Sequence, residues 1–257
     1  MDVKTMLKYG AGGAALFGAG ALATAIAIGQ LPLGASADRV KVETIVHDYL
    51  LAHPEIVAEM TNKLQAQQVE EQTKAQQEAL KQLGTKALTD SQVAFVAGPA
   101  DATVTVAEFF DYRCPHCKAS MAAIQHLLDK GAKVRVAFIE RPILTPDSIT
   151  AAIAAVASRR QGDKYVPFHF ALMATNGELP KERILDIAKS VGLDTAKLEK
   201  DMADPAVLQQ VKDSNALADK LHFDGTPTFV INDRIVVGEV TDDELQSLAK
   251  TAPKSTL

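Results

Sequence analysis

Two cysteines separated by two residues lie where a predicted strand meets a predicted helix, and the 257-residue chain contains no others. Cys114 and Cys117 stand in the stretch FFDYRCPHCKAS. Thr103–Phe110 has the composition of a strand, and Cys114–Leu128 carries apolar residues at helical spacing. Lys133–Glu140 follows as another strand, so the cysteines are predicted to lie within a βαβ unit with parallel strands.

Further strands and helices are predicted on both sides of this unit. Val93–Gly98 precedes it as a strand. A long helical stretch, Pro146–Leu221, follows it and is cut by Gly and Pro into four or five short helices. Pro227–Asn232 and Arg234–Glu239 form a predicted hairpin, and a last helix begins at Thr241. The predicted fold class is therefore α/β.

The first 37 residues have the pattern of an export signal. Lys4 and Lys8 precede an uncharged run, Tyr9–Ile28, and the triplet Ala35–Ala37 fits a cleavage site. An uncleaved anchor is the alternative, because the apolar run is nearly long enough to cross a bilayer. In both cases the rest of the chain is expected in the periplasm or elsewhere outside the cytoplasm.

A helical extension is predicted over residues 38–88. Val40–Leu64 holds most of its apolar residues, whereas the following twenty residues are rich in Gln, Glu, Lys and Ala and end at Gly84. A helix so polar is expected to bury little against its own domain. It is either a solvated spacer or part of a self-association arm, in which case the subunit contact is expected within Val40–Leu64.

The position of Cys114 at a helix start predicts a reactive thiol. Unsatisfied backbone N–H groups and the helix dipole favour the thiolate, so the pKa of Cys114 is expected below the free value of about 8.5. Pro115 suits the first helical turn, and His116 adds positive charge near the sulfur. A stabilised thiolate is a good leaving group, which makes the disulfide an oxidant. Cys117, one turn further along, is expected to be more buried and to act as the resolving thiol.

Other uses of the two cysteines are less well supported. A disulfide between them closes a very short loop and stabilises little. Structural zinc needs four ligands, and no matching Cys/His pair is present. The two thiols with His116 could still hold Cu(I), so copper handling is kept as an alternative. The net charge of −5 and the absence of Trp give no sign of a nucleic-acid partner.

A second motif lies more than a hundred residues away. GTPTF, Gly225–Phe229, places Thr226-Pro227 at the start of a predicted strand. Proline cannot donate to a β-ladder, so its presence there needs a reason. A cis peptide bond is one such reason and is expected here, with a trans proline in an ordinary turn as the alternative.

The order of strands, helices and motifs resembles the thioredoxin fold, and CPHC after EFFDYR resembles the DsbA family of extracytoplasmic thiol–disulfide oxidoreductases. The resemblance implies a thioredoxin-like core over residues 89–145 and 222–257, with an inserted helical domain over residues 146–221. Residues 38–88 resemble the N-terminal region of the ScsC-like branch, some of whose members oligomerise through it.

The family's functional residues are carried over one at a time. Cys114 matches the attacking cysteine and Cys117 the resolving one, which implies a redox-active disulfide and no separate cofactor or metal. Pro115 and His116 match the dipeptide that tunes the redox potential. The residue pair that faces the disulfide and contacts the substrate is matched by Thr226 and the cis-proline Pro227.

Glu108 falls where the family often has a buried carboxylate that handles the proton of the second cysteine. Burial in an apolar strand raises the pKa of a carboxyl toward a range suited to proton transfer. The alternative is an exposed glutamate on an edge strand.

The direction of exchange is left open between disulfide oxidase and isomerase. The CPHC dipeptide resembles strong oxidases, whereas Thr226 before the cis-proline resembles isomerase-like members. The implied partners are exported cysteine-containing proteins as substrates and a membrane redox partner that resets the pair, with a homo-oligomer through residues 38–88 as a further expectation. A structural protein on a thioredoxin scaffold is the remaining alternative.

Overall fold

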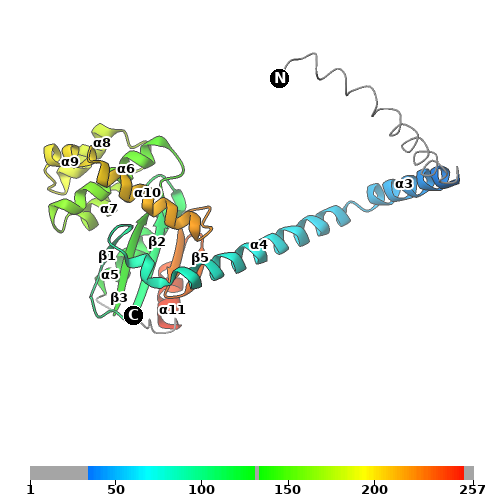
Figure 1. The fold of residues 1–257 in the computed structure, drawn as a ribbon, viewed down its shortest axis with the longest axis horizontal. Coiled ribbons are helices and arrows are strands. Elements are labelled where there is room, and N and C mark those ends of the chain that lie inside the picture. The colour runs from blue at the N-terminus through cyan, green and yellow to red at the C-terminus, as the bar shows by residue number, and fades with distance from the viewer. Residues whose placement is uncertain (1–33, 131–132, 252–257) are drawn as a thin grey trace, which may run out of the picture. The chain divides into compact units, whose positions relative to one another are not determined.

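The structure is a computed structural model that describes residues 34–130 and 133–251 (Figure 1). The predicted export signal, residues 1–37, lies outside this description except for the backbone of its last four positions, which are helical. The chain divides into two compact units, one ending at Gln67 and the other beginning at Gln68. None of the helices in the described ranges is both long and apolar enough to cross a bilayer.

A five-stranded sheet in the order β1-β3-β2-β4-β5 forms the centre of the second unit (Figure 1). Its strands are β1 Ala94–Ala97, β2 Val104–Phe110, β3 Val134–Glu140, β4 Thr228–Ile231 and β5 Arg234–Val237. β2 and β3 are parallel and joined by a helix, whereas the other three pairs are antiparallel. The predicted βαβ unit and the C-terminal hairpin are both confirmed.

Helices cover the sheet and extend beyond one end of it (Figure 1). α5 (Pro115–Asp129) connects β2 to β3 and packs against the C-terminal helix α11 (Asp242–Thr251). The predicted helical stretch consists of α6 Pro146–Ser158, α7 Tyr165–Ala174, α8 Lys181–Ser190, α9 Thr195–Met202 and α10 Pro205–Lys220. The α/β thioredoxin fold with added helices is confirmed.

Strand β2 lies in the middle of the sheet, and all seven of its residues are buried. Alternation along a strand sends successive side chains to opposite faces. Val106, Glu108 and Phe110 therefore share one face, where Val106 and Phe110 belong to the same apolar cluster as both cysteines. Glu108 is 2% exposed, so its predicted burial is confirmed and the exposed edge-strand alternative is wrong.

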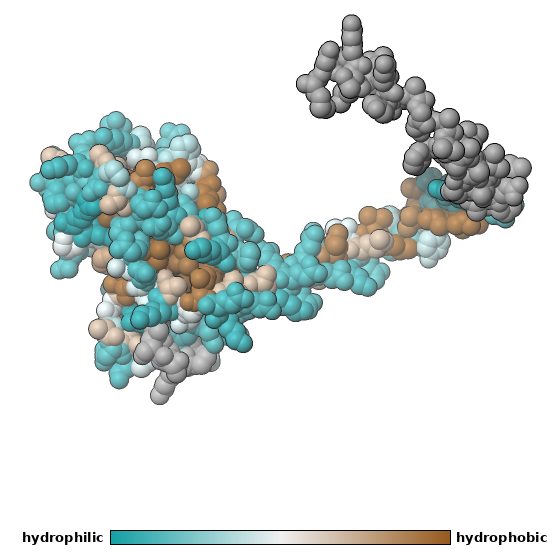
Figure 2. Space-filling model, in the orientation of Figure 1, coloured by the Kyte–Doolittle hydropathy of each residue, from teal (hydrophilic) through white to brown (hydrophobic). Residues whose placement is uncertain are grey.

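The first unit contains helix α3 (Gly34–Ala52) and the beginning of helix α4 (Glu55–Leu83). Hydrophobic residues recur along this segment (Figure 2). The large apolar side chains exposed there are Val40, Val42, Ile45, Val46, Tyr49, Leu50, Leu51, Val57, Met60 and Leu64. A run of exposed apolar side chains on helices is typical of a surface that packs against another chain.

The last turns of α4 differ from the sequence prediction. This polar helix was expected to bury little against its own domain, yet Gln76 is 5% and Leu80 is 3% exposed. Leu80 joins an apolar cluster on the second face of the sheet together with Phe109, Leu221 and Phe223. The spacing of four residues puts Gln76 and Leu80 on one side of the helix, which is enough to dock an otherwise polar segment.

Replacement of Leu80 by alanine tests this docking. We expect Leu80→Ala to lower the free energy of unfolding by about 2–4 kcal/mol, because it leaves a cavity in a closed apolar cluster. Leu83→Ala on the same helix is the matched control, since Leu83 is 38% exposed. Its expected loss is under about 1 kcal/mol. Equal losses in urea denaturation of the two variants would contradict the docking.

Candidate active site

Cys114 is the N-cap residue of α5, and Pro115 occupies the first helical position. The chain leaves β2 at Phe110 and turns within four residues, with the Cys114 amide donating to the Asp111 carbonyl at 3.0 Å. The Cys114 carbonyl accepts the first helical hydrogen bond, from the Lys118 amide at 3.2 Å. The sulfur therefore lies at the N-terminal end of the helix, as predicted.

The environment of Cys114 favours its thiolate. The pKa of this thiol is lowered from an ordinary 9.0 to about 5. The largest cause is a hydrogen bond from the Cys117 thiol, and the Thr226 side chain and the backbone amides of Cys117 and His116 add to it. Burial acts in the opposite direction, because Cys114 is only 3% exposed. Hydrogen bonding outweighs desolvation at this sulfur.

Cys117 has the opposite character. Burial raises the pKa of its thiol well above the ordinary value, and the hydrogen bond to Cys114 and the charge of Glu108 raise it further. Both cysteines are free thiols in the structure, and Cys117 is 1% exposed. The pair therefore combines one stabilised thiolate with one protonated thiol, which is the asymmetry that thiol–disulfide exchange requires.

Glu108 stands in the buried surroundings of this pair. Burial raises the pKa of its carboxyl to about 8, and negative charge on Cys114 and on Glu140 raises it further. At neutral pH the group is mostly protonated and holds a proton close to Cys117. The site thus contains a buried acid of suitable pKa beside the thiol that must gain and lose a proton.

Thr226 and Pro227 reach the cysteines from the other end of the sequence. The Thr226–Pro227 bond is cis, as predicted from the motif. The Thr226 carbonyl oxygen lies 3.2 Å from the Cys114 sulfur and accepts a hydrogen bond from it when the thiol is protonated. The pairing of β2 with β4 brings these residues together across 112 positions of sequence.

The His116 side chain is exposed and turns toward a residue that sequence reasoning did not identify. Its Nδ1 lies 2.9 Å from an Oε2 of Glu239, just beyond β5. The pKa of His116 is raised, mainly by the hydrogen bond from its imidazole to Glu239 and by that carboxylate's charge. Nothing in the local sequence around Glu239 marks this contact, which depends on the hairpin and the following loop.

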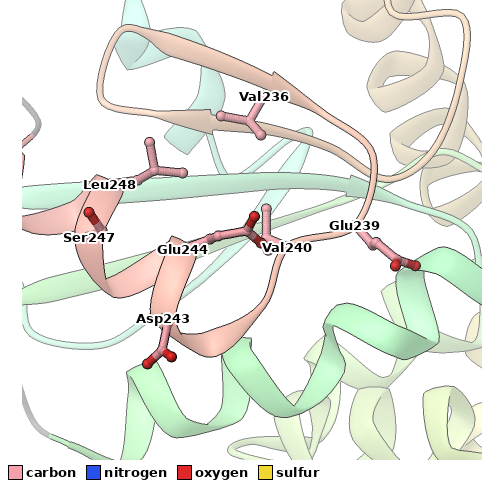
Figure 3. Close-up of a pocket in the computed structure, with 7 residues that line it drawn as sticks. All are labelled: Val236, Glu239, Val240, Asp243, Glu244, Ser247 and Leu248. Atoms are coloured by element: carbon pink, nitrogen blue, oxygen red, sulfur yellow. The ribbon is translucent and has the colours of Figure 1, made fainter.

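Glu239 also lines a pocket of about 470 Å³ (Figure 3). Its apolar lining comes from Val236, Val240 and Leu248, and its polar lining includes Asp243 and Glu244. The loop between β5 and α11 is tied to α5, because the Val240 amide donates to the Ser120 hydroxyl at 3.0 Å. An acidic and apolar surface is therefore fixed next to the Pro115–His116 dipeptide.

A buried carboxylate organises the loop in front of Cys114. Asp111 accepts hydrogen bonds from the Arg113 amide at 2.7 Å and from the Ser148 hydroxyl at 2.7 Å. Its other oxygen accepts from the Ile143 and Leu144 amides at 2.8 and 3.0 Å. The loop that carries the cysteine and the segment that enters α6 are thus joined at one side chain, which sequence reasoning also missed.

A second buried carboxylate links the sheet to the helical stretch. Glu140 accepts hydrogen bonds from the hydroxyls of Tyr112 at 3.3 Å and Tyr165 at 3.1 Å. The Tyr112 hydroxyl also lies 3.1 Å from Nδ1 of His169. Burial raises the pKa of Glu140 to about 8 and lowers that of His169 to about 3. These groups form a mainly neutral polar network behind the active site.

The copper alternative has few ligands in this arrangement. Across residues 34–130 and 133–251, no three His, Cys, Asp or Glu side chains are grouped so that they could hold a metal ion. Cys114 and Cys117 supply two sulfurs, while the imidazole of His116 faces Glu239. A copper site would therefore need either a two-sulfur geometry or a movement of His116.

Comparisons with known proteins identify the family of the chain. A family model described as thioredoxin matches residues 89–251, and one described as the copper resistance protein ScsC N-terminal domain matches residues 38–71. A thioredoxin-like oxidoreductase from Silicibacter pomeroyi DSS-3 is 44% identical, with a TM-score of 0.60, over 65% of this chain and 95% of that chain.

Two further solved structures are similar. The thiol-disulfide exchange protein α-DsbA2 from Wolbachia pipientis is 30% identical, with a TM-score of 0.62, over 69% of this chain and 95% of that one. Proteus mirabilis ScsC in a transitional conformation is 27% identical, with a TM-score of 0.62, over 84% of this chain and 96% of that one. The chain spans 24% of the length of the curated relatives matched first, two Na⁺/H⁺ antiporters from Salinispora species.

The rate of alkylation of the reduced protein should report the low pKa of Cys114. Because the thiolate is the reactive form, the rate with iodoacetamide should rise through about pH 5 and stay level to pH 8. The pKa of the folded state lies below that of the unfolded state. The stabilisation of the reduced protein by this thiolate is therefore complete above pH 9 and is lost as the pH falls to 5. A rate that keeps rising to pH 9 would contradict the assignment.

Two Cys117 variants serve as controls for that measurement. The Cys117 thiol is the main hydrogen-bond donor to Cys114, so Cys117→Ala should move the inflection to higher pH. Cys117→Ser keeps a hydroxyl donor at the same place, and its inflection should lie below that of the alanine variant.

Proposed function

We propose that this chain, which belongs to the DsbA-like, ScsC-like branch of the thioredoxin family, exchanges disulfides with other proteins outside the cytoplasm. The observation that carries the proposal is the pairing at α5 of a thiolate-stabilised Cys114 with a buried, protonated Cys117. The family supports an oxidoreductase, and the site supplies a nucleophile, a leaving group and a buried carboxyl that interacts electrostatically with both cysteines. The composition of residues 1–37 supports the location.

In the oxidising direction, a substrate thiolate attacks Sγ of Cys114 and the bond between Cys114 and Cys117 breaks. Cys117 leaves as a thiolate and takes a proton, while the substrate is held as a mixed disulfide on Cys114. A second substrate thiolate then attacks the substrate sulfur, and Cys114 leaves as the stabilised thiolate. The substrate loses two electrons as its disulfide forms, and the cysteine pair gains them.

Glu108 is the proposed carrier of the Cys117 proton. Its pKa of about 8 lets it donate at neutral pH to the strongly basic thiolate of Cys117 and recover the proton when Cys117 attacks. Pro115 and His116 between the cysteines are proposed to set the redox potential, with Glu239 raising the pKa of His116. No separate cofactor is needed in this scheme.

Isomerisation uses the same groups from the reduced state. The Cys114 thiolate attacks an incorrect substrate disulfide, forms a mixed disulfide and releases a substrate thiolate, which attacks another disulfide in the same protein. The substrate thiolate released by that exchange then attacks the mixed disulfide, which completes the rearranged substrate disulfide and frees Cys114 as the thiolate. The redox state in which a membrane partner keeps the pair then decides between oxidase and isomerase. The Thr226–Pro227 backbone is proposed to pair with an extended substrate segment, which gives affinity with little sequence preference.

Copper binding is the second candidate function. The match of residues 38–71 to the N-terminal domain of a copper resistance protein favours it, and two reduced thiols are soft ligands that Cu(I) prefers. This candidate does not exclude the first, because both use the reduced pair.

Self-association through the N-terminal helices is also proposed. Its support is the row of exposed apolar side chains between Val40 and Leu64, inside the segment that matches the ScsC N-terminal model. Paired helices with such rows bury them against each other. Several active sites in one assembly would suit isomerase activity.

Serine variants of the two cysteines test the exchange reaction. With reduced and with scrambled ribonuclease as substrates, Cys114→Ser should lose catalysis of refolding, because the hydroxyl is neither ionised nor able to form a disulfide. Cys117→Ser should accumulate a mixed disulfide with the substrate, since the resolving thiol is gone. Circular dichroism checks that both variants fold.

The result would contradict the proposal if Cys114→Ser refolded ribonuclease at the wild-type rate. The ratio of activity on scrambled to reduced substrate separates isomerase from oxidase. Thiol titration of the reduced protein with and without Cu(I) tests the copper candidate, which predicts protection of both thiols by about one equivalent of metal.

A charged residue placed in the apolar row tests self-association. In the chain without its predicted export signal, Ile45→Lys should reduce the molar mass measured by light scattering to that of one protomer, because it buries an unpaired charge in the contact. Thr44→Lys, one position earlier on the same exposed helix, is the matched control and should keep the assembly. A wild-type chain of protomer mass would contradict self-association.

A further inference from the structure

Helix α4 contacts the segment that leads into the cis-proline. Nε2 of Gln76 donates a hydrogen bond to the His222 carbonyl at 2.8 Å. One turn earlier, Nε2 of Gln72 donates to the carboxylate of Asp224 at 3.0 Å. Gln76 is 5% exposed, and it and Leu80 are the residues that α4 buries. A buried side-chain amide normally forms a hydrogen bond, because an unpaired polar group is costly to bury. The partner of Gln76 is a backbone carbonyl, that of His222.

The same segment is held at several other carbonyl groups. The Phe223 carbonyl accepts from Arg141 at 3.2 Å, and the Gly225 carbonyl accepts from the Thr228 hydroxyl at 2.9 Å. The Thr226 carbonyl is the one that faces the Cys114 sulfur at 3.2 Å. Side chains from α4, from Arg141 just after β3 and from β4 thus hold the carbonyls of residues 222, 223 and 225, and the Cys114 sulfur lies beside that of Thr226.

The backbone at the first of these positions needs such support. His222 has a φ of 56°, in the left-handed region that residues other than glycine adopt infrequently. The helix α10 ends just before it, and the chain reverses there toward β4. The bond from Gln76 meets the chain at this reversal, four residues before Thr226. A change of the His222 conformation would move the start of the segment that ends at the active site.

We infer that Gln76 is a positioning residue for substrate binding, which places the Thr226–Pro227 backbone opposite Cys114 by holding the His222 carbonyl. Gln72 supports the same segment through Asp224. The inference rests on the proposed function, because it assumes that an extended peptide pairs with the Thr226–Pro227 backbone. A helix of the N-terminal extension would then take part in substrate recognition without touching the substrate.

A purely structural role for Gln76 makes a different prediction. Loss of its hydrogen bond would then lower stability and leave the affinity for substrate unchanged. If Gln76 has a positioning role, loss of its hydrogen bond instead raises KM for a substrate that pairs with the Thr226–Pro227 backbone. The reason is that this backbone is then held opposite Cys114 for a smaller fraction of the time. The change in kcat is smaller, since the cysteines are positioned by α5, whereas Gln76 holds the segment that precedes β4.

Gln76→Glu separates these roles. The substitution keeps the length and helix preference of the side chain but removes the N–H donor. With a dithiol peptide as substrate, KM should rise about five-fold, the equivalent of one lost hydrogen bond, while kcat changes less than about two-fold. Gln77→Glu is the matched control, because Gln77 is the next residue on α4 and is exposed. Its KM should equal that of the wild type.

Gln72→Ala gives an independent measurement if Gln76→Glu fails to fold. Gln72 lies on the same side of α4 as Gln76 but is itself exposed, so its loss leaves the core intact, and KM should rise about two-fold. The positioning role is wrong if the wild type oxidises the peptide and the variants that fold share the KM of Gln77→Glu. Failure of the wild type to exchange disulfides with the peptide in either direction would instead overturn the proposed function.

Discussion

Negative charge on the Cys114 sulfur is stabilised at the first turn of α5 against the energetic penalty of burying it. The Cys117 thiol, the Thr226 side chain and two backbone amides all favour the thiolate, while burial opposes it. The net effect is a pKa of about 5, so hydrogen bonding decides the outcome. Each donor comes from a place that the fold fixes: the helix supplies the amides and Cys117, and the segment just before β4 supplies Thr226.

The two cysteines share a hydrogen bond but differ in charge because they differ in what surrounds them. The environment of Cys117 includes the buried carboxyl of Glu108, whose pKa is raised to about 8 by burial, by Cys114 and by Glu140. Burial is the largest cause of the raised pKa of Glu108, and the negative charge of the Cys114 thiolate adds to it by repulsion. The pKa of Glu140 is likewise raised mainly by burial, so both carboxyls are mostly protonated at neutral pH.

Much of the site was predictable from local patterns, and the rest depends on distant contacts. The strand before Cys114, the helix after it and the cis bond at Pro227 follow from periodicity and from the demands of proline, which are properties of neighbouring residues. Glu239 and Gln76 gave no signal, because their partners lie 123 and 146 positions away along the chain. The polar composition of α4 predicted an exposed helix, and Gln76 is instead buried. Gln76 and Leu80 are the two buried residues of α4, too few to change the mean hydropathy on which that prediction rests.

Thr226 connects the chemistry of the sulfur to the binding of substrate. Its side chain favours the Cys114 thiolate, and its carbonyl oxygen lies 3.2 Å from the Cys114 sulfur. At neutral pH the reduced sulfur is mainly a thiolate, and in a mixed disulfide it also carries no proton, so in neither state does Cys114 donate to this carbonyl. The carbonyl can then accept from the amide of an extended substrate segment. Its position therefore affects the affinity for substrate, and the contacts from α4 act on that affinity through it.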